Sequence, residues 1–473
     1  EERAGSIAKL YLQASRYFAG KMDTIFERYQ KQNGLSEADA RRLLNQIRTP
    51  GDIDELKQLL RQATEDGNSE KRKQLLGELE APAYRARLER LQRMYGNLDH
   101  VMQSIYKQEQ IEHEVVALQD MGHKRLALEA GEHPLNSIDY ILESIRTIYG
   151  IRHRNGAIRR VNVNIAATTV ENYRRLADAG IGTYILFQET YHSENYRRLH
   201  PYGPKSDYAW HTEAMDRAME GGIDDVGIGV LFGLSNYLYD FTGLMMHAEH
   251  LEAACGVGPH TISVPRICPA DDIDPAAFAD ALPDALFRKI VAVIRIAVPY
   301  TGMIISTRES PAMRREVLRL GISQISGGSN TSVGGYDDSD HGEEDTAQFD
   351  VSDRRTLDQV VAWLLDLGYV PSFCTACYRL GRTGDRFMSL VKQGRIADCC
   401  GPNALLTLSE YLADYASPET RAKGERIIAE QAECVPDVRV RARLREYLGK
   451  IGDGGRDFRS VSYTHLRAHE TGR

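Results

Sequence analysis

From about residue 98 onward, short runs rich in β-branched and aromatic residues alternate with segments whose apolar residues recur every three or four positions. Seven of the short runs have the composition of buried strands, and they span residues 124–131, 159–166, 183–190, 225–232, 260–267, 302–309 and 322–329. Segments of helical periodicity separate most of them; in the segment 138–150, for example, Ile141, Ile145 and Ile148 share one face. Strands alternating with helices of this length predict βα units around a parallel sheet.

The number of strands falls one short of a closed barrel. A (β/α)8 TIM barrel takes about 250 residues and eight strands, whereas this pattern contains seven. The segment 98–120 has the apolar stripe of an outer helix but no strand before it. We therefore predict an α/β fold of the (β/α)8 type that lacks its first strand. A seven-stranded or open barrel, or an unrecognised strand, is the alternative.

The segments on either side of the barrel differ from it in texture. Residues 1–97 have helical periodicity without strand signals, and we expect a helical N-terminal region there. The barrel is expected over 98–370 and a helical, charged C-terminal extension over 371–458. Residues 459–473 break the composition and resemble a translated sequencing adapter, so they are set aside as an artefact. The acidic run 337–345 is predicted to be a solvated loop.

Composition excludes some classes of function. Apolar residues make up 42% of the 473 residues and charged residues 27%, and the net charge is −8. A negative balance argues against nucleic-acid binding, because phosphates require an excess of cations. No apolar run reaches the roughly 20 residues of a membrane helix, and no signal peptide opens the sequence. These features predict a cytoplasmic protein without a membrane or nucleic-acid partner.

Cysteine is concentrated in one segment. Of seven cysteines, four lie between residues 374 and 400. Cys374 and Cys377 form C-x2-C, Cys400 follows after 22 residues, and Cys399 lies beside it. Thiolates at this spacing suit zinc or an iron–sulfur cluster. A structural zinc site needs a fourth ligand, whereas three thiolates on a cluster leave one iron open; buried inert thiols and a redox dithiol remain alternatives.

Other polar residues have weaker signals. Four cations lie between the cysteines and are candidates to offset thiolate charge: Arg379, Arg382, Arg386 and Lys392. His260 precedes a predicted strand, and a lone histidine of this kind is more often structural than a ligand. His247 and His250 are one helical turn apart, and both are predicted to be surface residues.

Many segments together resemble one known family. "MGHKRLALEAGE", "RRVNVNIAATTVENYR", "AGIGTYILFQETYH", "GVGPHTISVPR", "AVPYTGMIISTRE", "GISQISGGS" and "CTACYRLGRTGDRFMSLVKQGRI" are similar to the FeFe-hydrogenase maturase family HydG, over about residues 107–457. The resemblance implies a radical S-adenosylmethionine (SAM) tyrosine lyase with a (β/α)8 barrel. In that family one 4Fe–4S cluster cleaves SAM, and the resulting radical splits tyrosine into p-cresol and dehydroglycine. A second, auxiliary 4Fe–4S cluster in the C-terminal extension helps to form carbon monoxide and cyanide for the hydrogenase H-cluster, which implies hydrogenase maturation partners.

The same resemblance assigns ligands to the auxiliary cluster. Cys374, Cys377 and Cys400 match its three cysteine ligands, and Cys399 is an additional cysteine in this sequence. His260, in "GPHTIS", matches the histidine that holds a labile fifth iron of that cluster. The resemblance thus raises His260 from a structural residue to an expected ligand.

For SAM, the resemblance points to the ends of two strands. Ala130, Gly131 and Glu132 stand where the family has Gly-Gly-Glu at the methionine end of SAM, with Ala130 replacing the first glycine. Glu189 and Tyr191, in "QETY", are expected SAM contacts because barrel sites form at the carboxyl ends of strands.

For tyrosine, the expected binding group is a guanidinium. Arg308, in "STRE", is at the end of another strand and is expected to clamp the substrate carboxylate in bidentate fashion. Ser306, Ser326 and Ser329 are expected to add hydrogen bonds.

One expected motif is absent. The family binds its SAM-cleaving cluster with C-x3-C-x2-C after the first strand, but this sequence has no cysteine before Cys255. Strand one and this loop would fit after Tyr95, Gly96 and Asn97, so the strand count and the motif search indicate the same gap. A deletion or misassembly of coding sequence is the stronger explanation, and natural loss in a paralogue is the weaker one. We expect the chain as written to be inactive; a thiazole-synthesis tyrosine lyase and a non-catalytic cluster- or metal-binding paralogue are the alternatives.

Overall fold

A computed structural model describes residues 108–132, 136–201, 203–268, 278–330, 335–336, 351–394 and 396–459. The chain divides into two compact units, of which the first comprises Glu1–Ile105, Glu132–Ser137 and His200–Ser206 and the second the remainder. The fold described below is that of the second unit. The predictions for residues 1–107, for the acidic run 337–345 and for residues 460–473 lie outside the described residues.

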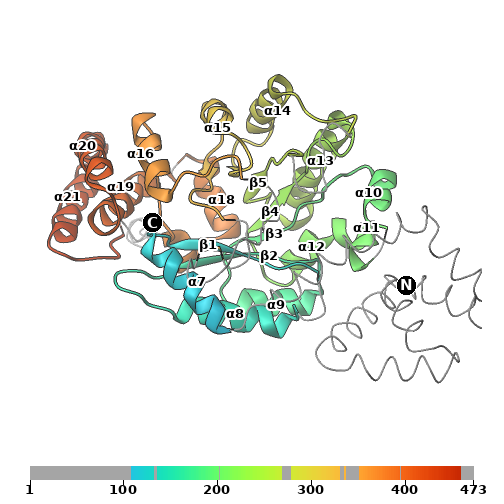
Figure 1. The fold of residues 1–473 in the computed structure, drawn as a ribbon, viewed down its shortest axis with the longest axis horizontal. Coiled ribbons are helices and arrows are strands. Elements are labelled where there is room, and N and C mark those ends of the chain that lie inside the picture. Colours follow the sequence, from blue (N-terminus) through green and yellow to red (C-terminus); the bar gives the residue numbers. More distant parts are fainter. Residues whose placement is uncertain are drawn as a thin grey trace, which may run out of the picture. The chain divides into compact units, whose positions relative to one another are not determined.

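All seven predicted strands are present and parallel. They are β1 (Arg125–Glu129), β2 (Arg160–Asn164), β3 (Tyr184–Ile185), β4 (Val226–Gly229), β5 (Thr261–Ser263), β6 (Gly302–Ile305) and β7 (Gln324–Ile325). Within the described residues each strand pairs only with its neighbours in sequence, in the order β1 to β7. The sheet is a curled half-barrel of the radical SAM type, which confirms the predicted fold without its first strand (Figure 1).

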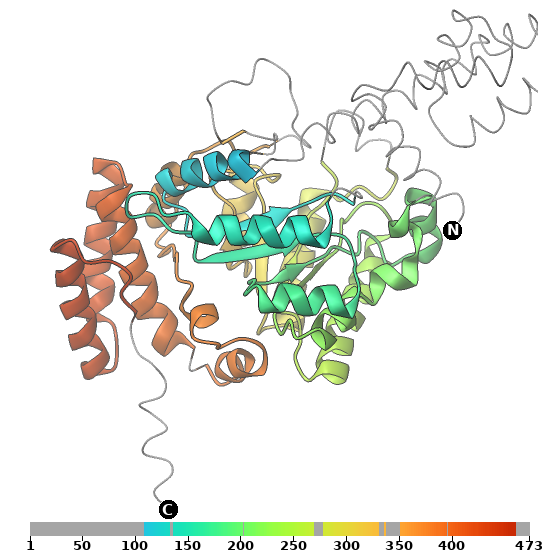
Figure 2. The same ribbon diagram turned by 90° about the horizontal axis from the view of Figure 1, so that it is seen from below.

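Helices follow the strands as the periodicity predicts. The first nine are α7 (Gln108–Asp120), α8 (Ile138–Gly150), α9 (Val170–Asp178), α10 (Ser193–Leu199), α11 (Tyr208–Thr212), α12 (Ala214–Glu220), α13 (Tyr237–Cys255), α14 (Asp284–Ala297) and α15 (Pro311–Leu318). In α8 the predicted face, with Ile141, Ile145 and Ile148, is buried against the sheet. Figure 2 shows these helices along the outside of the strands.

Strand alternation separates apolar from polar side chains. In β2, Val161 and Val163 are completely buried in the core between sheet and helices. The residues that alternate with them, Arg160 and Asn162, are polar, and Arg160 Nε donates to Asn162 Oδ1 over 2.8 Å. Because successive side chains of a strand point to opposite faces, the inner face of the sheet is lined by polar groups.

The C-terminal extension has a core of its own. It contains α16 (Leu357–Asp366), α17 (Ala376–Arg379), α18 (Gly384–Lys392), α19 (Ala397–Asp414), α20 (Pro418–Glu433) and α21 (Val438–Gly452). Helix α16 contributes Val360 and Leu364 to the barrel core but Leu357, Val361 and Leu365 to the core of the last three helices. In Figure 1 these helices gather beside α16.

Two contacts fix the segment α17–α18 against the amino ends of the strands. The Arg160 guanidinium lies 3.6 Å from the centre of the Tyr378 ring. The Gly384 N–H donates to Asp225 Oδ1 over 3.1 Å. These contacts join the cysteine-bearing extension to β2 and β4.

A buried ion pair holds the segment that follows β7. Arg314 and Asp353 are both buried and are bonded to each other, and Asp353 also accepts from Arg355.

Replacing Asp353 by alanine would leave a buried guanidinium without its main counter-charge, so we expect Asp353→Ala to lower the free energy of unfolding by about 3–5 kcal/mol. Chemical denaturation monitored by circular dichroism measures the change. The matched control is Asp366→Ala, which breaks the exposed pair with Lys423 and should leave stability near that of the wild type; equal losses in both variants would contradict the role of the buried pair.

Candidate functional site

At the carboxyl ends of the strands, three charged groups come together. Glu129 ends β1 and lies opposite Asn164, which ends β2. The Asn164 side chain and the Arg308 guanidinium both interact with the Glu129 carboxylate, but burial outweighs them and raises its pKa. Arg308 also faces Glu189 and Cys268, and burial lowers the pKa of its guanidinium. The Glu129 side chain nevertheless keeps solvent-accessible surface.

Glu189 has an unusual backbone. Its φ is +65°, in the left-handed region that residues other than glycine rarely occupy. Its carbonyl oxygen accepts the Leu231 N–H over 3.0 Å, which ties the turn after β3 to the end of β4. Backbone strain of this kind concentrates at ligand-binding and catalytic positions. The strained φ of Glu189 therefore marks it as a candidate ligand-binding residue.

The segment after β1 leads out of the sheet. The Ala130 N–H donates to the Asn164 carbonyl over 3.1 Å, which continues the β1–β2 ladder by one residue. Gly131 is exposed, and no atom lies within 4 Å of the position of an added Cβ. In the first unit, Glu132 Oε2 accepts the Lys205 N–H over 3.1 Å, and burial raises the pKa of Glu132.

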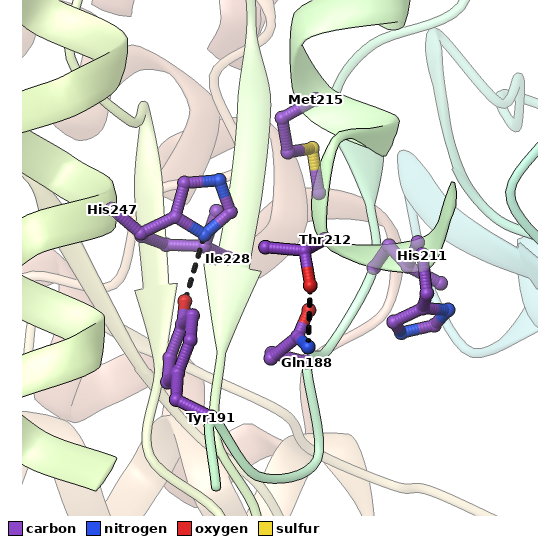
Figure 3. A pocket seen from close by; sticks show the side chains of 8 residues that line it. Gln188, Tyr191, His211, Thr212, Met215, Ile228 and His247 are labelled. Carbon is purple, nitrogen blue, oxygen red and sulfur yellow. Dashed lines mark hydrogen bonds between the residues drawn. The ribbon is translucent and has the colours of Figure 1, made fainter. Parts of the chain in front are cut away.

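Tyr191 does not join the carboxyl-end group. Its side chain is buried against Gly243 of α13, and its hydroxyl lies 2.7 Å from His247 Nδ1. Figure 3 shows this pair beside a cavity of about 10 Å³, which has room for about one water molecule and not for SAM. The cavity lies between β3, β4 and helices α11–α13. The prediction that His247 is a surface residue is wrong, because the helix turns it towards Tyr191; His250 is exposed, as predicted.

The three serines are in the neighbourhood of Arg308 or of the next strand end. Ser306 Oγ accepts the Arg308 N–H over 3.3 Å. The Ser326 carbonyl accepts from the buried Arg314, and all three serines, including Ser329, are half-buried. They follow β6 and β7, so they lie at the same edge of the sheet as Glu189.

At the opposite end, four thiols surround one guanidinium. Partial burial raises the pKa values of Cys374, Cys377 and Cys400, to about 12 at Cys400, and neighbouring cysteine sulfurs add to the increase at Cys377 and Cys400. Arg382 Nη1 donates to Cys399 Sγ over 3.9 Å, while its Nε and Nη2 are buried without a hydrogen-bond partner among the described residues. A buried guanidinium without an acceptor is costly, so the arrangement favours an anionic group among the thiols.

The other three cations of this segment are engaged elsewhere. Arg379 donates to both carboxylate oxygens of Asp457, Lys392 pairs with Glu252, and Arg386 donates to the Gly381 carbonyl over 3.5 Å. Of the four cations predicted to balance thiolate charge, Arg382 is therefore the one that lies directly against a thiol.

His260 is buried next to the extension. Its Nε2 is 3.0 Å from the Tyr378 hydroxyl and its Nδ1 is 3.4 Å from Asp225 Oδ2. Burial lowers the pKa of His260 to about 4, so the ring is neutral at pH 7. A neutral imidazole is the form that binds metals.

The donor set fits a cluster better than a single ion. Among the described residues, no three side chains of histidine, cysteine, aspartate or glutamate are placed to hold one metal ion. An iron–sulfur cluster contains several irons and is held by thiolates that are further apart than ligands of one ion. Three thiols, a buried guanidinium and a neutral imidazole are compatible with such a cluster.

Comparisons with known proteins agree with this geometry. The Radical SAM superfamily model matches residues 96–239, and the Biotin and Thiamin Synthesis associated domain matches residues 263–370. The 2-iminoacetate synthase of Escherichia coli (strain K12) is 31% identical over 279 residues, 58% of this chain and 71% of the relative. The chain belongs to the radical SAM family of HydG and 2-iminoacetate synthase. As a member it is a radical SAM enzyme of the lyase type, and the family uses a 4Fe–4S cluster and SAM.

Solved structures of this family are also similar. The crystal structure of HydG, a maturase of the FeFe-hydrogenase, is 55% identical with a TM-score of 0.72, covering 75% of this chain and 77% of that one. HydG from Carboxydothermus hydrogenoformans is 40% identical with a TM-score of 0.61, covering 72% and 74%. No helix among the described residues is long and apolar enough to cross a membrane.

Several polar residues of these two ends were missed from the sequence. Glu129 and Asn164 end adjacent parallel strands, and that position was a usable signal. Asp225 and Tyr378 gave no such signal, because their proximity to His260 depends on how the extension folds back.

The raised thiol pKa values predict that Cys400 is alkylated slowly in the metal-free protein. With a pKa of about 12, Cys400 is almost entirely protonated at pH 8, whereas the nucleophile is the thiolate. We expect iodoacetamide to modify Cys400 more than about a hundredfold more slowly than free cysteine, whose pKa is about 8.5. Peptide mass spectrometry over time measures the rate. Cys434, which is exposed like Cys400, is the internal control, and equal rates at the two cysteines would contradict the raised pKa of Cys400.

His247 is half-buried, with its Nε2 enclosed and without a hydrogen-bond partner among the described residues, and this predicts a loss of stability in acid. Burial lowers its pKa from 6.5 to about 4, so the unfolded chain takes up a proton before the folded one. The stabilisation is present above pH 6.5 and is lost as the pH falls towards 4, by at most about 3 kcal/mol. We expect the free energy of unfolding to fall less between pH 7 and 5 in His247→Gln than in the wild type. Denaturant titrations at both pH values test this, with exposed His250→Gln as control; parallel pH profiles for wild type and His247→Gln would refute it.

Proposed function

We propose that the chain is a radical SAM tyrosine lyase of the HydG type, whose C-terminal extension holds an auxiliary 4Fe–4S cluster. Cleavage of tyrosine would give p-cresol and dehydroglycine, and then carbon monoxide and cyanide for the H-cluster, with hydrogenase maturation proteins as partners. The observation that carries the proposal is the thiol cluster around Arg382, whose guanidinium has buried nitrogens without acceptors. The HydG structure at 55% identity supports the same assignment.

For the auxiliary cluster, we assign Cys374, Cys377 and Cys400 as ligands and His260 as the ligand of a labile iron. Arg382 is the counter-charge for the anionic thiolates. When bound, such a cluster supplies an iron able to hold diatomic ligands. The chain's own contribution is to bring the three thiols together beside Arg382 and to keep the imidazole neutral.

We place the binding site for SAM and tyrosine at the carboxyl ends of the strands. Arg308 would take the tyrosine carboxylate, because its guanidinium lies near Glu129 and Glu189 at the carboxyl ends of the strands and can pair with a carboxylate in bidentate geometry. Glu189 would contact SAM. Ser306, Ser326 and Ser329 would add hydrogen bonds to tyrosine. Ala130, Gly131 and Glu132 would contact the methionine end of SAM. The Tyr191 side chain, bonded to His247, would act only by fixing the turn that carries Glu189.

The residues present do not fit the SAM-cleaving cluster. That cluster needs a three-cysteine loop, and no cysteine precedes Cys255. We therefore assign no reaction step to it, and propose that a chain of this sequence does not release p-cresol. We propose that residues 1–97 form the N-terminal region, residues 98–370 the barrel and residues 371–458 the cluster-binding extension.

Anaerobic reconstitution with iron and sulfide tests the assignment. We expect one 4Fe–4S cluster per chain, close to four sulfides, and its loss in Cys374→Ala, because a thiolate ligand is removed. Iron and sulfide analysis and visible absorption measure the content, and Cys434→Ala, which alters an exposed cysteine remote from the site, is the control. Zinc without iron would favour a non-catalytic metal-binding protein. Two clusters per chain, or p-cresol formation, would disprove the proposed loss of SAM cleavage.

A further inference from the structure

Two buried polar atoms at the amino end of the sheet face each other without a hydrogen bond. His260 Nδ1 and Asp225 Oδ2 are 3.4 Å apart, and neither has a hydrogen-bond partner among the described residues. Both side chains are more than nine-tenths buried. Unsatisfied buried groups cost about 1–3 kcal/mol each, so a small ring movement that closes this contact would be favourable.

The Asp225 carboxylate is held where it is. Its Oδ1 accepts the Gly384 N–H at the start of α18, over 3.1 Å. Gly384 has a φ of +53°, and an added Cβ would come within 2.5 Å of Asp224 Cβ, so the extension approaches β4 as closely as a glycine permits. Because one oxygen is fixed by this backbone bond, the other stays aimed at His260. The neighbouring Asp224 is exposed and accepts instead from Thr383.

The second ring nitrogen of His260 meets a tyrosine of the extension. The Tyr378 hydroxyl lies 3.0 Å from Nε2, and Tyr378 directly follows Cys377 in sequence. A carboxylate beside Nδ1 favours the tautomer with its proton on Nδ1, which leaves a lone pair on Nε2. With that tautomer, the Tyr378 O–H donates to the Nε2 lone pair, and Thr183 Oγ1, 3.3 Å from the same hydroxyl, and the Asp225 carboxylate are its alternative partners.

We propose that Asp225 is the positioning residue that keeps the His260 proton on Nδ1 and so presents Nε2 to iron, and that the Tyr378 hydroxyl occupies Nε2 until iron replaces it. The inference rests on the proposed role of His260 as a ligand of the labile iron. It assigns opposite effects to two side chains that touch the same ring: Asp225 supports iron binding, and Tyr378 competes with it.

The test uses the full-length chain, reconstituted anaerobically with iron and sulfide and then titrated with Fe(II). Loss of an outer carboxylate typically weakens metal affinity 10–100-fold, and we expect this in Asp225→Asn, with sulfide per chain unchanged. Tyr378→Phe removes the competing O–H and should bind the additional iron a few-fold more tightly, whereas a purely structural role would weaken binding in both variants. Asp224→Asn is the matched control and should behave as the wild type. Chelator-accessible iron, quantified against sulfide, gives the affinity.

A second measurement does not depend on iron. In the metal-free chain, ¹⁵N chemical shifts of labelled histidine, with the His260 signals assigned by their loss in His260→Gln, report the tautomer. We expect the proton on Nδ1 in the wild type and a shift towards Nε2 in Asp225→Asn. A wild-type proton on Nε2, or an unchanged tautomer in the variant, would overturn the inference.

The outcomes separate the inference from the proposed function. If His260→Gln loses the additional iron while Asp225→Asn retains it at wild-type affinity, the ligand assignment stands and the positioning role is wrong. If His260→Gln retains the iron, or the wild type assembles no cluster, the proposed function fails at this site. The tautomer measurement then still decides whether Asp225 orients the ring.

Discussion

The parallel register of the sheet is the constraint on which both candidate sites depend. Each described strand pairs only with its sequence neighbours and in the same direction, so all amino ends meet at one end of the sheet and all carboxyl ends at the other. Polar residues far apart in sequence are thereby sorted into two groups. Glu129, Glu189 and Arg308 come together at the carboxyl end, and Asp225 and His260 at the amino end.

At the amino end, the sheet alone does not make a site. The thiols arrive on the extension, and the extension is held there by the Arg160–Tyr378 stacking and by the Gly384–Asp225 hydrogen bond. The same two residues that dock the extension, Asp225 and Tyr378, also contact the two nitrogens of His260. Docking of the extension and orientation of the histidine therefore share the residues Asp225 and Tyr378.

The sequence was sufficient for features that repeat along the chain and insufficient for those that depend on tertiary approach. All seven strands and the α8 face follow from periodicity, because burial imposes the same pattern on every βα unit. The prediction that His247 is a surface residue was wrong because the sequence around His247 does not show that Tyr191, in the turn after β3, packs against α13 and contacts it. Likewise, four cations near the cysteines were equivalent in sequence, and only the fold shows that Arg379 and Lys392 have carboxylate partners while Arg382 faces the thiols.

The edge strand β1 contributes differently to the two ends of the described sheet. Glu129 belongs to β1, which has β2 as its single described neighbour, and its side chain keeps solvent-accessible surface, so the carboxyl-end group includes a residue of an open edge. Unpaired strand edges are an aggregation hazard as well as a loss of enclosure. The amino-end contacts instead use Arg160, Thr183, Asp225 and His260, whose strands or strand ends lie further from that edge. Within the described sheet, the amino-end contacts therefore belong to strands or strand ends that have a neighbouring strand on both sides, whereas the carboxyl-end group includes a residue of the edge strand β1.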